Sequence, residues 1–80
     1  MKLQDVFLLN GKLFMHGIKM DMNVFGIIFS YKEFNLACFD GYNLQLNEEI
    51  RKQKTNTVEL LKLNTLICIL REYGVEEYVG

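Results

Sequence analysis

Alternation of apolar and polar positions predicts strands through the first half of the chain. Residues 16–22 are apolar at every second position, with Ile18, Met20 and Met22 on one side and charged residues between them. This period of two is typical of a half-buried strand. Residues 24–31 are apolar at almost every position, which predicts a central strand buried on both faces.

Glycine-containing dipeptides punctuate the same region. Asn10-Gly11 and Asp40-Gly41 each lie between two apolar segments, the first within residues 6–15 and the second within residues 35–46. Asn-Gly and Asp-Gly supply the positive φ angles of two-residue turns, so both dipeptides predict β-hairpins. Gly26, inside the central apolar run, indicates a bulge or a close approach of another backbone.

The N-terminal segment has an alternative interpretation. Leu3, Val6 and Phe7 also fit one face of a short helix that ends at Asn10-Gly11. The aromatic and branched content of this segment, mirrored across the turn, favours the strand. We therefore expect residues 2–9 to be a strand, with a helix as the alternative.

Beyond residue 46 the apolar period changes and predicts helices. Asn47 precedes two glutamates, which is typical of an N-cap, and Ile50 can anchor a short helix or turn there. Thr57 precedes residues 58–73 and Gly74 follows them. The N-cap, the apolar period and the C-terminal glycine agree on a long helix.

This long helix carries two groups of apolar residues. Its main stripe has a spacing of three and four, which suits packing across a sheet, and consists of Leu60, Leu63, Leu66, Ile67, Leu70 and Tyr73. A second ridge, outside that stripe, consists of Leu61, Cys68 and Ile69. Residues 75–80 are expected to form a short edge strand or to fray.

Together these elements predict a single α+β domain over residues 1–80. Its expected architecture is an antiparallel four- to five-stranded meander sheet with one long C-terminal helix packed across one face. One helix covers only one face, so the second ridge and the strand at 24–31 need a further cover. We therefore expect a homodimer, with a candidate interface formed by Leu61, Ile69, Met20 and Met22.

Composition and charge exclude several other classes. The 80 residues are 50% apolar, too hydrophobic for a disordered chain and too few for two domains. The net charge of −1 leaves no basic half to follow a phosphate backbone, so nucleic acid is not an expected partner. Apolar runs are far shorter than a membrane span, and no signal-peptide pattern is present, so we expect a cytoplasmic location without membrane attachment.

Catalytic and metal-binding groups are sparse. Cys38 and Cys68 lie in apolar segments without a CxxC spacing, which favours buried reduced thiols over a disulfide or a zinc site. The single serine, Ser30, lies in the predicted central strand, and no phosphate-binding loop is present. A thiol nucleophile with His16 as its base is the remaining enzymatic alternative. We expect no catalysis, no cofactor and no metal.

A two-residue turn at Asn10-Gly11 would also fix a register between its strands. That register sets Asp5 opposite His16 on one face, with Cβ atoms roughly 4.5–5.5 Å apart. Because no third catalytic group accompanies them, we interpret these two residues as a structural pair.

The function expected from these observations is that of a non-enzymatic interaction protein that binds another macromolecule. The expected partner is a protein. The abundance of Asn, Lys and Ile, which A- and T-rich codons encode, favours a regulator or inhibitor carried by a mobile element. One alternative is a small-molecule binding or sensing domain, with its ligand between sheet and helix near Met20, Met22 and Tyr73. A weaker alternative is a nucleic-acid accessory protein that uses the cationic cluster Arg51, Lys52 and Lys54.

Overall fold

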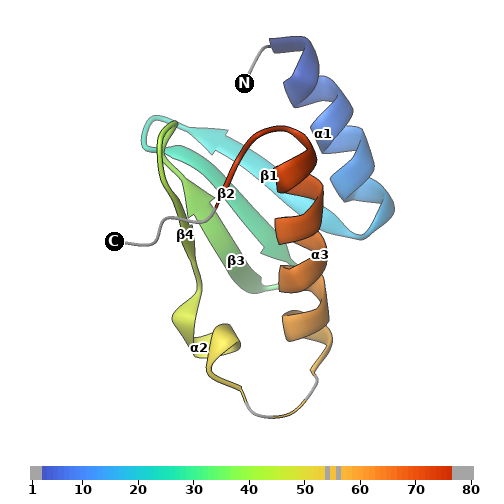
Figure 1. Ribbon diagram of the computed structural model, residues 1–80, viewed down its shortest axis with the longest axis vertical. Coiled ribbons are helices and arrows are strands. Elements are labelled where there is room, and N and C mark those ends of the chain that lie inside the picture. The colour runs from blue at the N-terminus through green and yellow to red at the C-terminus, as the bar shows by residue number, and fades with distance from the viewer. Residues whose placement is uncertain (1–2, 54, 56, 77–80) are drawn as a thin grey trace.

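The computed structural model describes residues 3–53, 55 and 57–76 (Figure 1). Four antiparallel strands form one sheet in the order β1-β2-β3-β4, accompanied by helices. This arrangement confirms the predicted α+β class, the meander and the C-terminal helix. The elements in chain order are α1 (Leu3–Met15), β1 (Ile18–Asn23), β2 (Gly26–Tyr31), β3 (Phe34–Phe39), β4 (Leu44–Leu46), α2 (Glu48–Arg51) and α3 (Val58–Glu72).

The predicted hairpin around Asn10-Gly11 is wrong, because residues 3–15 form one continuous helix. Leu9 and Leu13, one helical turn apart, are both fully buried. This spacing of four places both side chains on the face of α1 that packs on β1 and α3. The alternative of a short helix was correct in type but ended too early.

Gly17, rather than Gly11, ends α1. Its φ of 75° lies in the left-handed region, and its backbone N–H donates to the carbonyl of Phe14 at 3.0 Å. The chain then turns directly into β1. The Asp5–His16 pair is therefore a wrong prediction: Asp5 lies in the first turn of α1 and His16 just after its last. A rise of about 1.5 Å per residue separates them by roughly 16 Å along the helix.

The strands follow the predicted pattern with shifted ends. β1 and β2 are joined by a turn at Val24 and Phe25, so the central strand begins two residues later than expected. A Cβ atom added at Gly26 would overlap the carbonyl oxygen of Phe39, and the φ of Gly26 is 137°. The predicted close approach of another backbone at Gly26 is thus confirmed. The predicted hairpin around Asp40-Gly41 is also confirmed, with a wider loop over residues 40–43.

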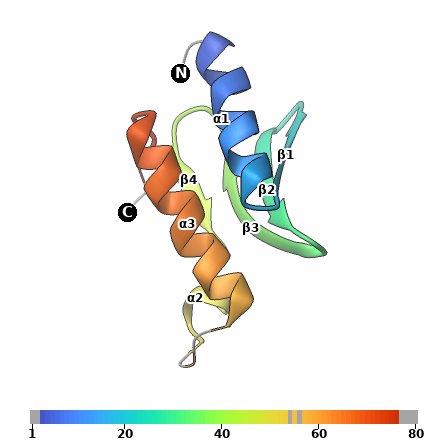
Figure 2. The ribbon, with the colours of Figure 1, turned by 90° about the vertical axis from the view of Figure 1, so that its right-hand side faces the viewer.

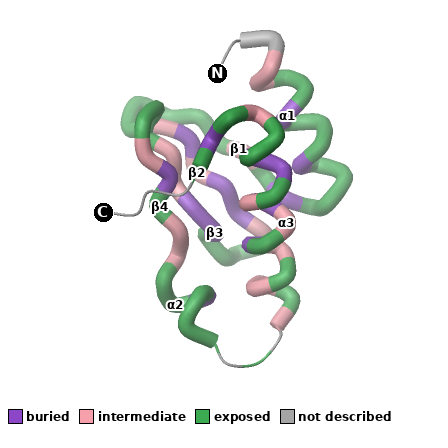
Figure 3. The backbone as a smooth tube through the Cα atoms, viewed as in Figure 1, coloured by how far each residue is buried: buried purple, intermediate pink, exposed green. Residues whose placement is uncertain are grey.

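Both long helices pack on one face of the sheet. Figure 2 shows α1 and α3 side by side, and contacts join α1 to β1, α3 to β3, and the two helices to each other. Strand register places Met20, Phe29, Ala37 and Leu46 in one row on this face. Figure 3 shows the buried residues gathered between the helices and this side of the sheet. Helix α1 thus adds to the cover of this one face, and the further cover that was expected for the opposite face is not supplied within the chain.

The opposite face of the sheet is open and largely polar. Its two rows across the strands are Lys19, Ser30 and Asn35, and then Asp21, Ile28, Cys38 and Gln45. Ser30 is buried there, and Ile28 and Cys38 are half-buried. The central strand, predicted to be buried on both faces, is therefore deeply buried on the face that the helices cover and only partly buried on the opposite face.

The predicted caps of α2 and α3 are confirmed. The Asn47 side chain accepts a hydrogen bond from the backbone of Glu49, and Thr57 Oγ1 accepts one from the backbone of Leu60. At the other end of α3, Gly74 N–H donates to the carbonyl of Arg71, and Val75 N–H donates to that of Leu70. This paired pattern, with a φ of 79° at Gly74, is a Schellman motif.

Candidate interaction site at the loop end of the sheet

Three of the most exposed apolar side chains lie at one end of the sheet, on its connecting loops. Val24, Phe25 and Tyr42 are 97%, 85% and 91% exposed. Met22, also exposed, precedes them on β1. We call these four residues the tip patch. Both loops that carry it lie at the upper left of Figure 1.

A local hydrogen bond fixes the β1–β2 turn. The side chain of Asn23 accepts a hydrogen bond from the backbone N–H of Phe25 at 2.8 Å, which closes an Asx-turn. Val24 and Phe25 occupy the two central positions of this turn, where polar residues and glycine are usual. The turn therefore holds two large apolar side chains in solvent with a backbone that is already ordered.

In the β3–β4 loop, too, a side-chain oxygen accepts hydrogen bonds from the backbone of the loop. Asp40 Oδ1 accepts hydrogen bonds from the backbone N–H groups of Tyr42 at 2.8 Å and Asn43 at 2.7 Å. Donation by Asn43, and then by Tyr42, stabilises the carboxylate and lowers the pKa of Asp40 below its ordinary value of 3.8. Tyr42 is thereby presented on a loop whose backbone is tied to a charged side chain.

The bases of the two loops are packed against each other. Gly26 begins β2 directly after the first turn, and its α-carbon faces the backbone of Phe39 and Asp40, where the second loop begins. Only glycine leaves room for this contact. The relative position of the two loops is consequently fixed by backbone packing.

Charge near the tip patch is acidic. Asp21 and Asp40 flank the two loops, and no lysine or arginine occurs in residues 20–31 or 33–50. The sequence around both loops therefore carries negative charge and no positive charge.

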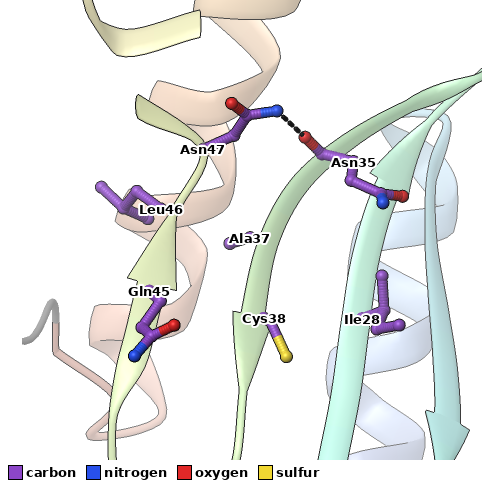
Figure 4. Close-up of a pocket in the computed structure, with 7 residues that line it drawn as sticks. All are labelled: Ile28, Asn35, Ala37, Cys38, Gln45, Leu46 and Asn47. Carbon is purple, nitrogen blue, oxygen red and sulfur yellow. Dashed lines mark hydrogen bonds between the residues drawn. The ribbon is translucent and has the colours of Figure 1, made fainter. Parts of the chain in front are cut away.

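The open face of the sheet holds a shallow hollow of about 250 Å³ between β3 and β4 (Figure 4). Its polar lining consists of the amides Asn35, Gln45 and Asn47 and the Cys38 thiol. The Asn47 amide donates to the backbone carbonyl of Asn35 at 2.7 Å. All of these groups are uncharged amides or a thiol, and no catalytic constellation is formed by them.

A second hollow, of about 330 Å³, lies between β4, α2 and α3. Arg51 and Arg71, the two arginines of the chain, both line it, together with apolar residues that include Leu60 and Ile67. These arginines are twenty positions apart in the sequence, so no local motif could have paired them.

Among the candidate interface residues, burial separates two from the others. Ile69 is only 7% exposed and belongs to the core, which corrects its placement on an outer ridge, and Met20 is half-buried against that core. Leu61 and Met22 are exposed, on α3 and β1 respectively. The four residues therefore do not form one surface.

The other candidate residues lie on separate surfaces. Arg51 and Lys52 are exposed at the end of α2, whereas Lys54 lies outside the described residues. Cys38 and Cys68 are free thiols, and Cys68 is exposed rather than buried as expected. His16 is exposed, and its carbonyl accepts a hydrogen bond from the Lys62 ammonium at 2.6 Å.

Sequence reasoning missed the tip patch because an apolar run was interpreted as one strand. A signal was present: Asn23 and Gly26 bracket Val24 and Phe25, and Asx and Gly are turn residues at those positions. In the described part of the chain, no three His, Cys, Asp or Glu residues are grouped so as to hold a metal ion.

Comparison with known proteins gives no relative: no family model, no curated protein and no solved structure matches this chain. Over the described residues, every helix is too short or too polar to cross a bilayer.

Proposed function

We propose that the protein is a non-enzymatic interaction module that binds another protein through the tip patch. The observation that carries this proposal is the almost complete exposure of Val24, Phe25 and Tyr42 on two hydrogen-bonded loops. Large aromatic side chains that enter a pocket on a partner supply most of the binding energy of many interfaces. Loops ordered before binding lose less conformational entropy when the complex forms.

The chemistry of the patch supports a protein partner over other macromolecules. Its side chains are apolar or aromatic, and the flanking charges are the carboxylates of Asp21 and Asp40. Phosphate-bearing partners would be repelled by these carboxylates. The partner surface that fits best is an apolar pocket with a neutral or basic rim.

A cytoplasmic regulator or inhibitor is the concrete form of this proposal. The exposed thiol of Cys68 supports a reducing compartment, in which free thiols persist. The abundance of Asn, Lys and Ile, which A- and T-rich codons encode, supports an origin in a mobile element.

The test compares affinity capture by three versions of the full chain. The wild type should retain a discrete protein from a lysate of the source organism, and the double variant Phe25→Ser, Tyr42→Ser should lose it. Phe34→Ser is the matched control, since Phe34 is an exposed phenylalanine beside the turn at the opposite end of the sheet. A photo-crosslinking residue at position 25 should label the same protein.

Capture that is equal for the wild type and the double variant would contradict the proposal. So would a captured species that is lost only in the Phe34 control.

One observation favours a small ligand as the second candidate. Arg51 and Arg71 line the hollow beside α3, and guanidinium groups bind carboxylates well. A ligand with a carboxylate and a short apolar part would suit this lining. Thermal unfolding with a series of alkyl carboxylates, compared between the wild type and Arg71→Gln, tests this candidate. A stabilisation that is equal in both proteins would exclude it.

A further inference from the structure

Helix α1 presents a second apolar surface, on the side turned away from the sheet. Phe7, Leu8, Phe14 and Met15 are 63–83% exposed, although Leu9 and Leu13 of the same helix are fully buried. We call these four exposed residues and Gly11 the α1 ridge. A solvated helix face normally carries charged residues, so the exposure of these apolar side chains needs an explanation.

The α1 ridge is symmetric about Gly11. Leu8 and Phe14 lie three residues before and after it, and Phe7 and Met15 lie four residues before and after it. Residues three and four apart lie on the same face of a helix. Reversing the direction of the helix therefore exchanges apolar positions for apolar positions.

Gly11 itself is not explained by the fold of a single chain. A Cβ atom at this position would meet nothing within 4 Å, and Gly11 has no positive φ. A glycine inside a helix costs about 1 kcal/mol relative to alanine. Its absent side chain does, however, let another backbone approach closely.

Charge does not oppose a contact between two such faces. Lys12 is the single charged residue in positions 6–15, and its ammonium forms an ion pair with Glu72 of α3. This pair directs the Lys12 side chain towards α3. Two copies could therefore bring their ridges together without like-charge repulsion.

We propose that the α1 ridge binds a second copy of this chain, with the two α1 helices antiparallel and a two-fold axis at Gly11. In this arrangement Leu8 packs near the partner's Phe14, and Phe7 near the partner's Met15. Each contact occurs twice, as in any isologous interface.

The available area is sufficient for such a dimer. At roughly 200 Å² for each large side chain, four side chains exposed by 63–83% offer about 600 Å² per copy. A typical specific interface takes about 800 Å² from each partner, so the ridge with its polar rim is of the required size.

Sedimentation equilibrium of the full chain tests the proposal. We expect a dimer at micromolar concentration, and Phe14→Glu should weaken it by at least about 30-fold, the factor that corresponds to one hot-spot residue. Phe25→Glu is the matched control, because it places the same charge at an equally exposed phenylalanine of the tip patch, and it should leave the dimer intact. Circular dichroism checks that both variants are folded.

Cross-linking tests the geometry of the dimer by a second, independent measurement. In a Cys38→Ser, Cys68→Ser background, Gly11→Cys should form an intermolecular disulfide, because the two-fold axis brings both copies of position 11 together. A mixture of Leu8→Cys and Phe14→Cys chains should form mixed disulfides in preference to either self-pair. A protein that is monomeric at high micromolar concentration would overturn the proposal. So would a dimer that does not form these disulfides and is not weakened by Phe14→Glu.

Discussion

Gly26 is the residue at which one added methyl group is expected to destabilise the fold most. Its φ of 137° is unfavourable for any side chain, and a Cβ atom there would overlap the backbone of Phe39. Gly26→Ala should lower the free energy of unfolding by about 3 kcal/mol through strain and overpacking. Urea denaturation measures this loss.

Gly11→Ala is the matched control for Gly26→Ala. Because a Cβ at Gly11 meets no atom of its own chain within 4 Å, this variant should raise the stability of the monomer by up to about 1 kcal/mol when unfolding is measured below the concentration at which the proposed dimer forms. The two substitutions are chemically identical, so equal effects would show that the close approach at Gly26 does not exist.

Asp40 gives the β3–β4 loop a dependence on pH. Its pKa is lowered in the folded chain by the backbone donors of Asn43 and Tyr42, so its contribution is present above the unfolded pKa and is lost as pH falls through the folded value. An NMR titration should show the Asp40 carboxyl with a pKa below 3.8. Asp40→Asn should remove the accompanying chemical-shift change at the Tyr42 amide, and a Tyr42 amide that titrates unchanged in this variant would contradict the assignment.

At the scale of elements, α3 is secured at its N-terminus by Thr57. Thr57→Ala leaves the Leu60 N–H without its side-chain acceptor and should cost about 1 kcal/mol, whereas Thr57→Ser should cost little. Thr65→Ala is the control, because Thr65 donates within the helix to the Leu61 carbonyl and alanine is the better helix former. Thermal unfolding should therefore separate the two alanine variants.

The elements that were predicted correctly are those whose signals agree with one another. In α3 the cap, the apolar stripe and the final glycine all indicate one helix between Thr57 and Gly74. In α1 they conflict: the outer residues Phe7 and Phe14 fill the positions that would reveal a helical period, and Asn10-Gly11 resembles a hairpin turn. Packing of Leu9 and Leu13 against distant residues decides the outcome, and a local pattern does not contain that information.

The candidate site was hidden for a related reason. Val24 and Phe25 belong to an apolar run, and apolar runs are ordinarily buried. Their exposure depends on where β1 ends and β2 begins. The sequence indicated a close approach at Gly26, but the residue that approaches it, Phe39, is thirteen positions away and is identified only in the folded chain.

For the whole molecule, two phenylalanines on the same hairpin should behave in opposite ways. Phe29 is fully buried at the centre of the core, and Phe29→Ala should cost about 3–5 kcal/mol. Phe25 is 85% exposed, and Phe25→Ala should change stability by less than about 0.5 kcal/mol. Parallel denaturation of both variants measures the contrast. A large loss in Phe25→Ala would mean that this side chain stabilises the fold and is not reserved for a partner.

The neighbour-to-neighbour order β1-β2-β3-β4 has a kinetic consequence. A short connection joins the two strands of every pair, so little loop-closure entropy is lost when each pair forms. Refolding should be correspondingly fast for a mixed α/β chain.

The exception is the docking of α1 on α3, which joins Lys12 to Glu72, sixty positions apart. If this docking follows the transition state, Leu13→Ala will accelerate unfolding and leave the folding rate nearly unchanged. Of the helices described, α1 comes first in the chain and would then be the last to pack.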